Sequence, residues 1–69
     1  MDNAELKAAL LSAAPVILSH ADGHDGEYKC VAAIVYRAKN GGILVSAELL
    51  DLNGRCVVNC DPKKIRLKE

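Results

Sequence analysis

Apolar side chains recur every three or four residues at the start of the chain, which is the spacing of one face of an α-helix. The residues on this stripe are Leu6, Ala9, Leu10 and Ala13. Asp2 or Asn3 can cap the helix, and Glu5 follows Asp2 at the spacing of a capping box. Pro15 ends it, because the residue before a proline is pushed out of the helical conformation. The pattern therefore predicts a helix over residues 3–13.

Beyond Pro15 the chain changes to short segments rich in β-branched residues, separated by turn residues, which is typical of antiparallel strands. The predicted strands are 16–19, 28–38, 43–52, 55–60 and 65–68. Asn40-Gly41 is a turn signal, and Asn53-Gly54 permits the positive φ angles of a type I′ hairpin. We expect the second strand to pair with the third, and the third with the fourth.

One helix followed by five short strands predicts a mainly β fold in a single domain, residues 1–69. Five antiparallel strands close naturally into a small barrel, which removes exposed sheet edges. The order matches a Src-homology-3-like barrel, with a long loop after the first strand, tight hairpins among the next three, and a 3₁₀ turn at 61–65 that points Ile65 into the core. The alternative is an α+β fold in which the helix packs on a curved antiparallel meander.

The two long strands carry apolar residues on both faces. Strict alternation along the first of them puts one set on one face: Tyr28, Cys30, Ala32, Ile34 and Tyr36. The opposite face is polar only at its ends: Lys29, Val31, Ala33, Val35 and Arg37. In a strand with one face exposed to water, apolar and polar side chains should alternate along the whole length. One short helix can cover only part of the second apolar face. We therefore expect a homodimer or a hetero-complex through the sheet or the helix.

Length and composition restrict the function further. A chain of 69 residues buries about 60% of the surface that it exposes when unfolded, so a core and a deep substrate cleft are hard to combine. The composition, 51% hydrophobic and 26% charged, is typical of a globular protein. Tyr28 and Tyr36 are the only aromatic residues, which excludes a platform that stacks several single-stranded bases.

Charge is balanced overall but divided along the chain. Residues 1–27 carry five acidic groups and one lysine, whereas residues 28–69 carry eight basic and four acidic groups. Candidate contacts for a nucleic acid or a protein partner are therefore basic: Arg37, Lys39, Arg55, Lys63 and Lys64, with Arg66 and Lys68 beside them. The alternative is an ordinary solvated face, because carboxylates are interspersed and the net charge is zero.

Two pairs of potential metal ligands stand out: His20 with His24, and Cys56 with Cys60. Two histidines and two cysteines suit tetrahedral zinc, but four residues of strand span about 13 Å, and two thiolates on one zinc lie within roughly 4 Å. The loop around Asp22 and Asp25 also lacks the ligand spacing of a calcium loop. We expect no metal and no cofactor.

No constellation in the sequence indicates catalysis. Cys30, His20 and His24 could be assembled into a nucleophile and base, but nothing local supports this, and neither a glycine-rich phosphate loop nor a nucleophile elbow is present. We expect no enzyme and no small-molecule substrate. An odd cysteine count, no signal-peptide pattern and no run of about 20 apolar residues favour a cytoplasmic protein with reduced thiols that does not enter membranes.

Several short segments resemble a family of short proteins encoded in phages and prophages of clostridia-like bacteria. The matching segments are Glu5-Leu6-Lys7, Pro15-Val16, Tyr28-Lys29-Cys30, Ile34-Val35-Tyr36-Arg37, Val45-Ser46-Ala47-Glu48-Leu49-Leu50-Asp51 and Gly54. The resemblance implies a bacterial or prophage cytoplasmic origin and carries no assigned activity. The loop at 20–27 is longer than in the family. The hypothesis from the sequence is a non-enzymatic protein-interaction or accessory module, and the alternative is a nucleic-acid-binding accessory protein of a mobile element.

Overall fold

Helix α1 (Asn3–Ser12) opens the fold in the computed structural model, which describes residues 1–68. The N–H of Glu5 donates to Asp2 Oδ1 at 2.8 Å, and the N–H of Asp2 donates to Glu5 Oε1 at 3.1 Å. Both halves of the predicted capping box are therefore formed. The helix is one residue shorter than predicted, because Ala13 adopts a left-handed conformation with φ 53° before Pro15.

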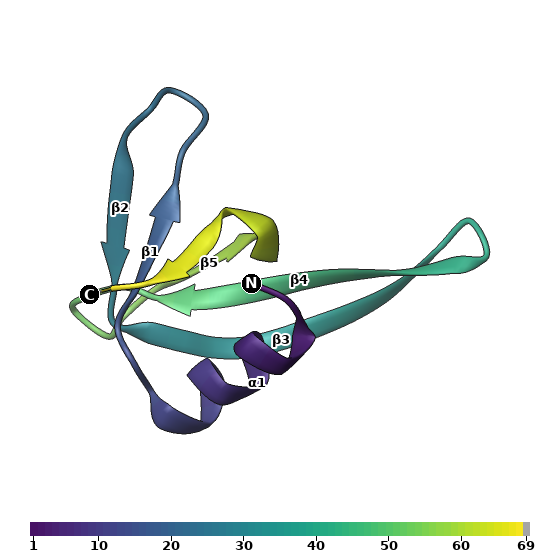
Figure 1. Cartoon of the computed structure of the whole chain (residues 1–69), viewed down its shortest axis with the longest axis horizontal. Helices are drawn as coiled ribbons and strands as arrows, with labels where there is room; N and C mark the ends of the chain where they lie inside the picture. Colours follow the sequence, from purple (N-terminus) through teal and green to yellow (C-terminus); the bar gives the residue numbers. More distant parts are fainter. Residues whose placement is uncertain (69) are drawn as a thin grey trace.

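Six strands follow the helix and form two separate antiparallel sheets (Figure 1). The strands are β1 (Val16–Ser19), β2 (Asp25–Tyr28), β3 (Cys30–Lys39), β4 (Gly42–Leu50), β5 (Val57–Cys60) and β6 (Ile65–Leu67), with the 3₁₀ turn η1 (Pro62–Lys64) before the last. The sheet orders are β2-β1-β6 and β3-β4-β5. The mainly β fold with one N-terminal helix is confirmed. In residues 1–68, however, six strands replace the predicted five, and they do not close into a barrel.

The additional strand arises at Lys29, where the predicted strand 28–38 is divided. The chain becomes extended at Asp25, earlier than expected, and β2 pairs with β1 whereas β3 pairs with β4. The N–H of Lys29 donates to the carbonyl of Leu50 at 2.9 Å, so the chain passes from one sheet to the other without a loop. The polar composition of Asp25-Gly26-Glu27 predicts a loop, but backbone pairing with β1 holds this segment in a strand.

A β-bulge at Ala32 decides which side chains of β3 share a face. The register with β4 shifts by one residue between Val31 and Ala33, which leaves Ala32 unpaired. Val31 therefore lies on the same face as Ile34, and Ala33 and Val35 lie on the other. The expected face of Val31, Ala33 and Val35 is wrong, because strict alternation cannot anticipate an extra residue.

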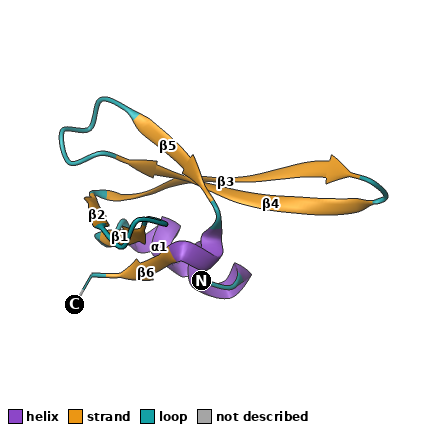
Figure 2. Cartoon of the chain, turned by 90° about the horizontal axis from the view of Figure 1, so that it is seen from above, coloured by secondary structure: helices purple, strands orange, loops and turns teal. Residues whose placement is uncertain are grey.

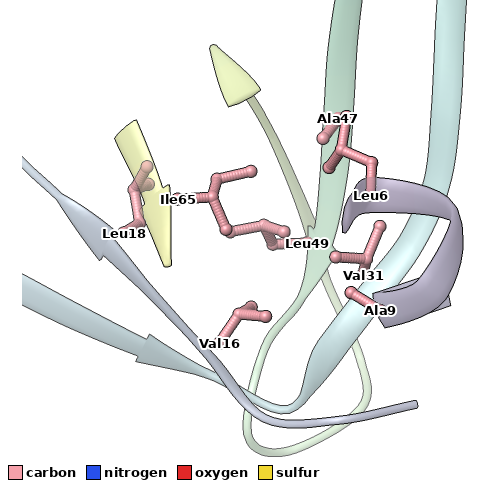
Figure 3. Packing of buried hydrophobic residues seen from close by; sticks show 8 residues of the cluster. All are labelled: Leu6, Ala9, Val16, Leu18, Val31, Ala47, Leu49 and Ile65. Atoms are coloured by element: carbon pink, nitrogen blue, oxygen red, sulfur yellow. The ribbon is translucent and has the colours of Figure 1, made fainter. Parts of the chain in front are cut away.

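The core lies between the two sheets and is closed by α1 (Figure 3). Its buried side chains are Leu6, Ala9, Val16, Leu18, Val31, Ala47, Leu49 and Ile65. Leu6 and Ala9 of the helix lie against Val31 of β3, as Figure 3 shows. Ile65 is 4% exposed, which confirms its predicted inward position after the 3₁₀ turn. All eight side chains are aliphatic, so apolar packing holds the face of the helix against the sheets.

The two Asn-Gly pairs form different turns. Lys39 pairs with Gly42, and Asn40 and Gly41 between them have φ 46° and 80°, which is the arrangement of a type I′ turn. Asn53-Gly54 lies in a wider loop, where only Gly54 of the pair has a positive φ and its N–H donates to the carbonyl of Asp51 at 3.0 Å. The predicted type I′ hairpin at Asn53-Gly54 is therefore wrong. Strand β5 begins two residues later than the predicted 55–60.

The β3–β4 hairpin extends well beyond β5, as Figures 1 and 2 show. Strand β5 pairs only with β4 residues 47–50, whereas β3 and β4 remain paired to the turn at 40–41. We call the projecting part of this hairpin, residues 35–46, the arm. The arm extends away from the core, and it bears the candidate site described below.

Candidate protein-interaction surface

A groove of about 740 Å³ runs beside the arm at the point where β5 stops. One wall of the groove is β4 itself, and the other wall is formed by the start of the chain and the connection from β5 to η1. The lining residues are Met1–Asn3, Ile43–Ser46 and Asn59–Lys63. The groove exists because β4 continues for five residues past the last residue that pairs with β5.

The arm exposes apolar side chains on both of its faces. Ile43 is 73% exposed and Tyr36 is 53% exposed on the face that continues the core, and Leu44 is 47% exposed on the opposite face. The bulge at Ala32 is what puts Tyr36 on the core-side face with Ile34. Large apolar side chains gathered at one projecting element are typical of an interaction surface rather than of an ordinary solvated strand.

The edge of β4 that lines the groove offers unpaired backbone groups. Residues of an antiparallel strand direct their N–H and C=O alternately to one neighbour and to the other. Leu50 accepts from Lys29 on the β3 side, and Asp51 donates to Cys56 on the β5 side. The alternation therefore directs the N–H and C=O groups of Ile43 and Val45 to the β5 side, where β5 is no longer present.

The wall of the groove opposite β4 is held in place by hydrogen bonds. Asp61 Oδ1 accepts from the N–H of Lys63 at 3.0 Å, which starts η1. The amino group of Met1 donates to the carbonyl of Pro62 at 2.7 Å. Pro62 itself is buried. This wall is therefore preformed, and Asp2 and Asp61 are among the residues that line the groove.

The predicted basic contacts do not gather on one surface. Arg37 and Lys39 are in the arm, whereas Arg55 lies in the β4–β5 loop at the other end of β4, about 20 Å of strand away. Lys63 and Lys64 belong to η1, and Lys63 lines the groove. Only Arg37, Lys39 and Lys63 are thus associated with the arm and its groove.

Arg66 and Lys68 are engaged by acidic side chains of β2. Arg66 donates to Asp25 Oδ2 at 2.6 Å and to Ser19 Oγ at 2.9 Å. Lys68 pairs with Glu27. The Arg66 guanidinium holds the pKa of the Asp25 carboxyl below its usual range. These pairs join the three strands of the β2-β1-β6 sheet across its solvent face, so a structural role accounts for them.

The candidate metal ligands lie in two different parts of the fold. His20 and His24 are exposed in the β1–β2 loop, where the N–H of His20 donates to the carbonyl of His24 at 2.8 Å. Cys56 precedes β5 and Cys60 ends it, with the length of the strand between them. Over residues 1–68, no three side chains of His, Cys, Asp or Glu gather into a group that can hold a metal ion. The absence of a metal site stays a prediction.

The three cysteines are free thiols in different environments. Cys56 is exposed, whereas Cys30 and Cys60 are half-buried. Burial raises the pKa of the Cys60 thiol, and the neighbouring Asp61 carboxylate adds to the rise. Cys60 Sγ also approaches the carbonyl of Ala47 at 3.6 Å, so it packs as part of β5. In this environment Cys60 is a poor nucleophile, because a thiol attacks as its thiolate.

The sequence did not predict that segment Ile43–Ser46 lines a groove, although it did predict uncovered apolar residues on both long strands.

Comparison of the chain with models of protein families, with curated proteins and with solved structures finds no match. Among residues 1–68, no helix has the length and apolar character needed to cross a membrane.

Proposed function

We propose that this chain is a non-enzymatic protein-interaction module whose binding surface is the arm with its groove. The observation that carries the proposal is the continuation of β4 past β5, which leaves apolar side chains and unpaired backbone groups at one place. An open strand edge beside exposed apolar side chains binds extended or edge-strand partners through main-chain hydrogen bonds and side-chain contacts. The partner is a protein.

The separation of the basic side chains favours this function over the nucleic-acid-binding alternative. A phosphate backbone is bound by cations along one surface, and each neutralised phosphate adds to affinity. Here Arg37 and Arg55 lie at opposite ends of β4, and Arg66 and Lys68 are paired with carboxylates. We expect at most weak binding to nucleic acid, lost between about 50 and 200 mM salt.

We also propose that the fold is a Src-homology-3-like barrel that is opened at the arm. In its support, Lys29 connects β2 directly to β3, so that β2 and β3 act as one bent strand shared by both sheets. Counted in this way the chain has five strands, with η1 before the last. The proposal includes the origin and location that the resemblance implies: a phage or prophage accessory protein in the bacterial cytoplasm.

Site-specific photocrosslinking tests the proposed surface. A benzophenone amino acid replaces Ile43 in the arm, and in a matched control it replaces Leu11, which is 87% exposed on α1. We expect irradiation of cells that naturally express the chain to give covalent protein adducts of defined mass from position 43 and not from position 11. Equal or absent adducts at the two positions would contradict the proposal, whatever the mass of the partner.

A further inference from the structure

We propose that the partner of the arm is a second copy of this chain, bound edge to edge through β4 about a two-fold axis at Leu44. The inference rests on the proposed function, because it names the occupant of the same surface. In this arrangement Ile43 of one copy lies opposite Val45 of the second copy, and Val45 lies opposite Ile43. The two β3–β4 arms then form one continuous four-stranded antiparallel sheet.

The direction of the backbone groups supports this register. The N–H and C=O groups of Ile43 and Val45 face the open edge, and those of Leu44 face β3. Antiparallel pairing of Ile43 with Val45 of the second copy therefore makes hydrogen-bonded pairs on both sides of the axis. The two Leu44 residues form the non-hydrogen-bonded pair between them, in which side chains approach most closely. A shift of one residue would leave these groups unmatched.

Charge complementarity favours a second copy over an unrelated strand. The arm, residues 35–46, carries Arg37 and Lys39 and no acidic residue. Among residues 1–68, neither has a carboxylate within ion-pair distance. In the two-fold arrangement Gly42 lies opposite Ser46 of the other copy, so Lys39, which pairs with Gly42, comes near the end of β5 in that copy, where Asp61 follows Cys60 and Glu48 lies on β4. Arg37 pairs with Leu44 and lies beside the axis. Lys39 therefore comes near acidic side chains of the other copy at both ends of the paired strands.

Apolar contacts add to the hydrogen bonds. The Ile43 side chain, 73% exposed in one copy, lies beside Val45 of the second copy on the core-side face. The Leu44 side chains meet on the opposite face. Segment Gly42–Ser46 has no charged residue and no proline, so it lacks the side chains that protect many edge strands against pairing. A two-fold contact uses the same surface on both copies and closes without forming fibres.

Two variants at position 43 separate the backbone contribution from the side-chain contribution. Ile43→Pro removes an N–H that faces the groove and leaves the pairing of β3 with β4 intact, as proline is tolerated on the open side of an edge strand. Ile43→Thr, the matched control, retains the N–H and loses apolar surface. Sedimentation equilibrium measures assembly, and circular dichroism checks that each variant is folded.

We expect the wild type to sediment as a dimer of twice the 7.4 kDa chain mass. We expect Ile43→Thr to dimerise more weakly, and Ile43→Pro to raise the dissociation constant at least about tenfold beyond the threonine variant. Equal dissociation constants for the two variants would overturn the edge pairing. A monomeric wild type whose position 43 still crosslinks to other proteins would overturn this inference and leave the proposed function standing.

A disulfide experiment keeps the inference testable if the proline variant does not fold. Leu44→Cys and the control Leu52→Cys are made in a chain that carries Cys56→Ser, since Cys56 is exposed. The two Leu44 positions form a non-hydrogen-bonded pair, whose Cα separation of about 4.5 Å suits a disulfide. We expect oxidation to give a covalent dimer through residue 44 and not through residue 52. Equal yields from the two positions would overturn the register.

Discussion

At the scale of single residues, aspartates hold the turns of this fold through backbone hydrogen bonds. Each of four carboxylates accepts an N–H two to four residues further along: Asp2 from Glu5, Asp22 from His24, Asp51 from Arg55 and Asp61 from Lys63. These acids therefore stabilise the helix start, two loops and the 3₁₀ turn. The hydrogen bond from Arg55 holds the pKa of the Asp51 carboxyl below its usual range.

The lowered pKa of Asp51 predicts a contribution to stability that depends on pH. A carboxyl whose pKa is lower in the folded chain stabilises the fold above its unfolded pKa, about 3.9, and loses this contribution as the pH falls through the folded pKa. We therefore expect Asp51→Asn to flatten the decrease in urea midpoint between about pH 5 and pH 2. Parallel curves for the two proteins would contradict this role of the carboxylate.

The cysteines allow a second prediction at this scale, about the order of alkylation. Burial raises the pKa of the Cys60 thiol, so little thiolate is present at neutral pH, whereas Cys56 is exposed. We expect iodoacetamide to modify Cys56 first and Cys60 much more slowly, as followed by mass spectrometry of peptides. In urea the two rates should converge. Faster modification of Cys60 in the native protein would show that β5 does not protect it.

At the scale of elements, the bulge in β3 couples the core to the arm. Because Ala32 is the extra residue, Val31 points into the core beside Leu49, and the next core-side residue is Ile34. The same offset continues along the strand and directs Tyr36 to the core-side face of the arm. The bulge therefore determines which face of the arm carries aromatic surface.

Paired threonine substitutions test this assignment of faces. Val31 is 2% exposed, so Val31→Thr buries a hydroxyl in an aliphatic core and should lower the free energy of unfolding by about 1–3 kcal/mol. Val35→Thr changes a half-buried residue on the other face, and we expect a loss within about 0.5 kcal/mol. Chemical denaturation measures both. Equal losses of unfolding free energy would contradict the bulge, because they would indicate that Val31 and Val35 lie on the same face of β3.

At the scale of the whole molecule, one aliphatic cluster joins the helix and both sheets. Its eight side chains come from α1, β1, β3, β4 and β6, so each sheet covers the face of the other that would otherwise be exposed. The arm lies outside this cluster and contributes little to it. The body of the fold can therefore remain stable while the arm is free to bind.

The docking of α1 predicts a contrast between two leucines of the same helix. Leu6 is 0% exposed and Leu11 is 87% exposed. Leu6→Ala should lower the free energy of unfolding by about 2–5 kcal/mol, which is a large part of the stability of a small domain. Leu11→Ala, the control, should change it by less than about 0.5 kcal/mol. Similar effects of the two substitutions, measured by urea unfolding, would contradict the observed packing of α1.

The sequence by itself determined the local elements. Periodicity and the capping box indicated α1, the Asn40-Gly41 turn and β propensity indicated the β3–β4 hairpin, and the 3₁₀ turn at 61–65 placed Ile65 inward. The physical reason is that each of these features depends on neighbours within a few residues. Helix caps, turn conformations and alternating faces are properties of short segments.

Only the tertiary structure decided how these elements divide between sheets and where the candidate site lies. The break at Lys29, the bulge at Ala32 and the strand conformation of Asp25–Tyr28 depend on partners that are distant in sequence. The groove forms because β4 extends beyond its last residue paired with β5. This difference in length between two strands cannot be read from the sequence of either strand alone. Backbone pairing between distant segments sets these features, because any residue type except proline supplies the same N–H and C=O groups.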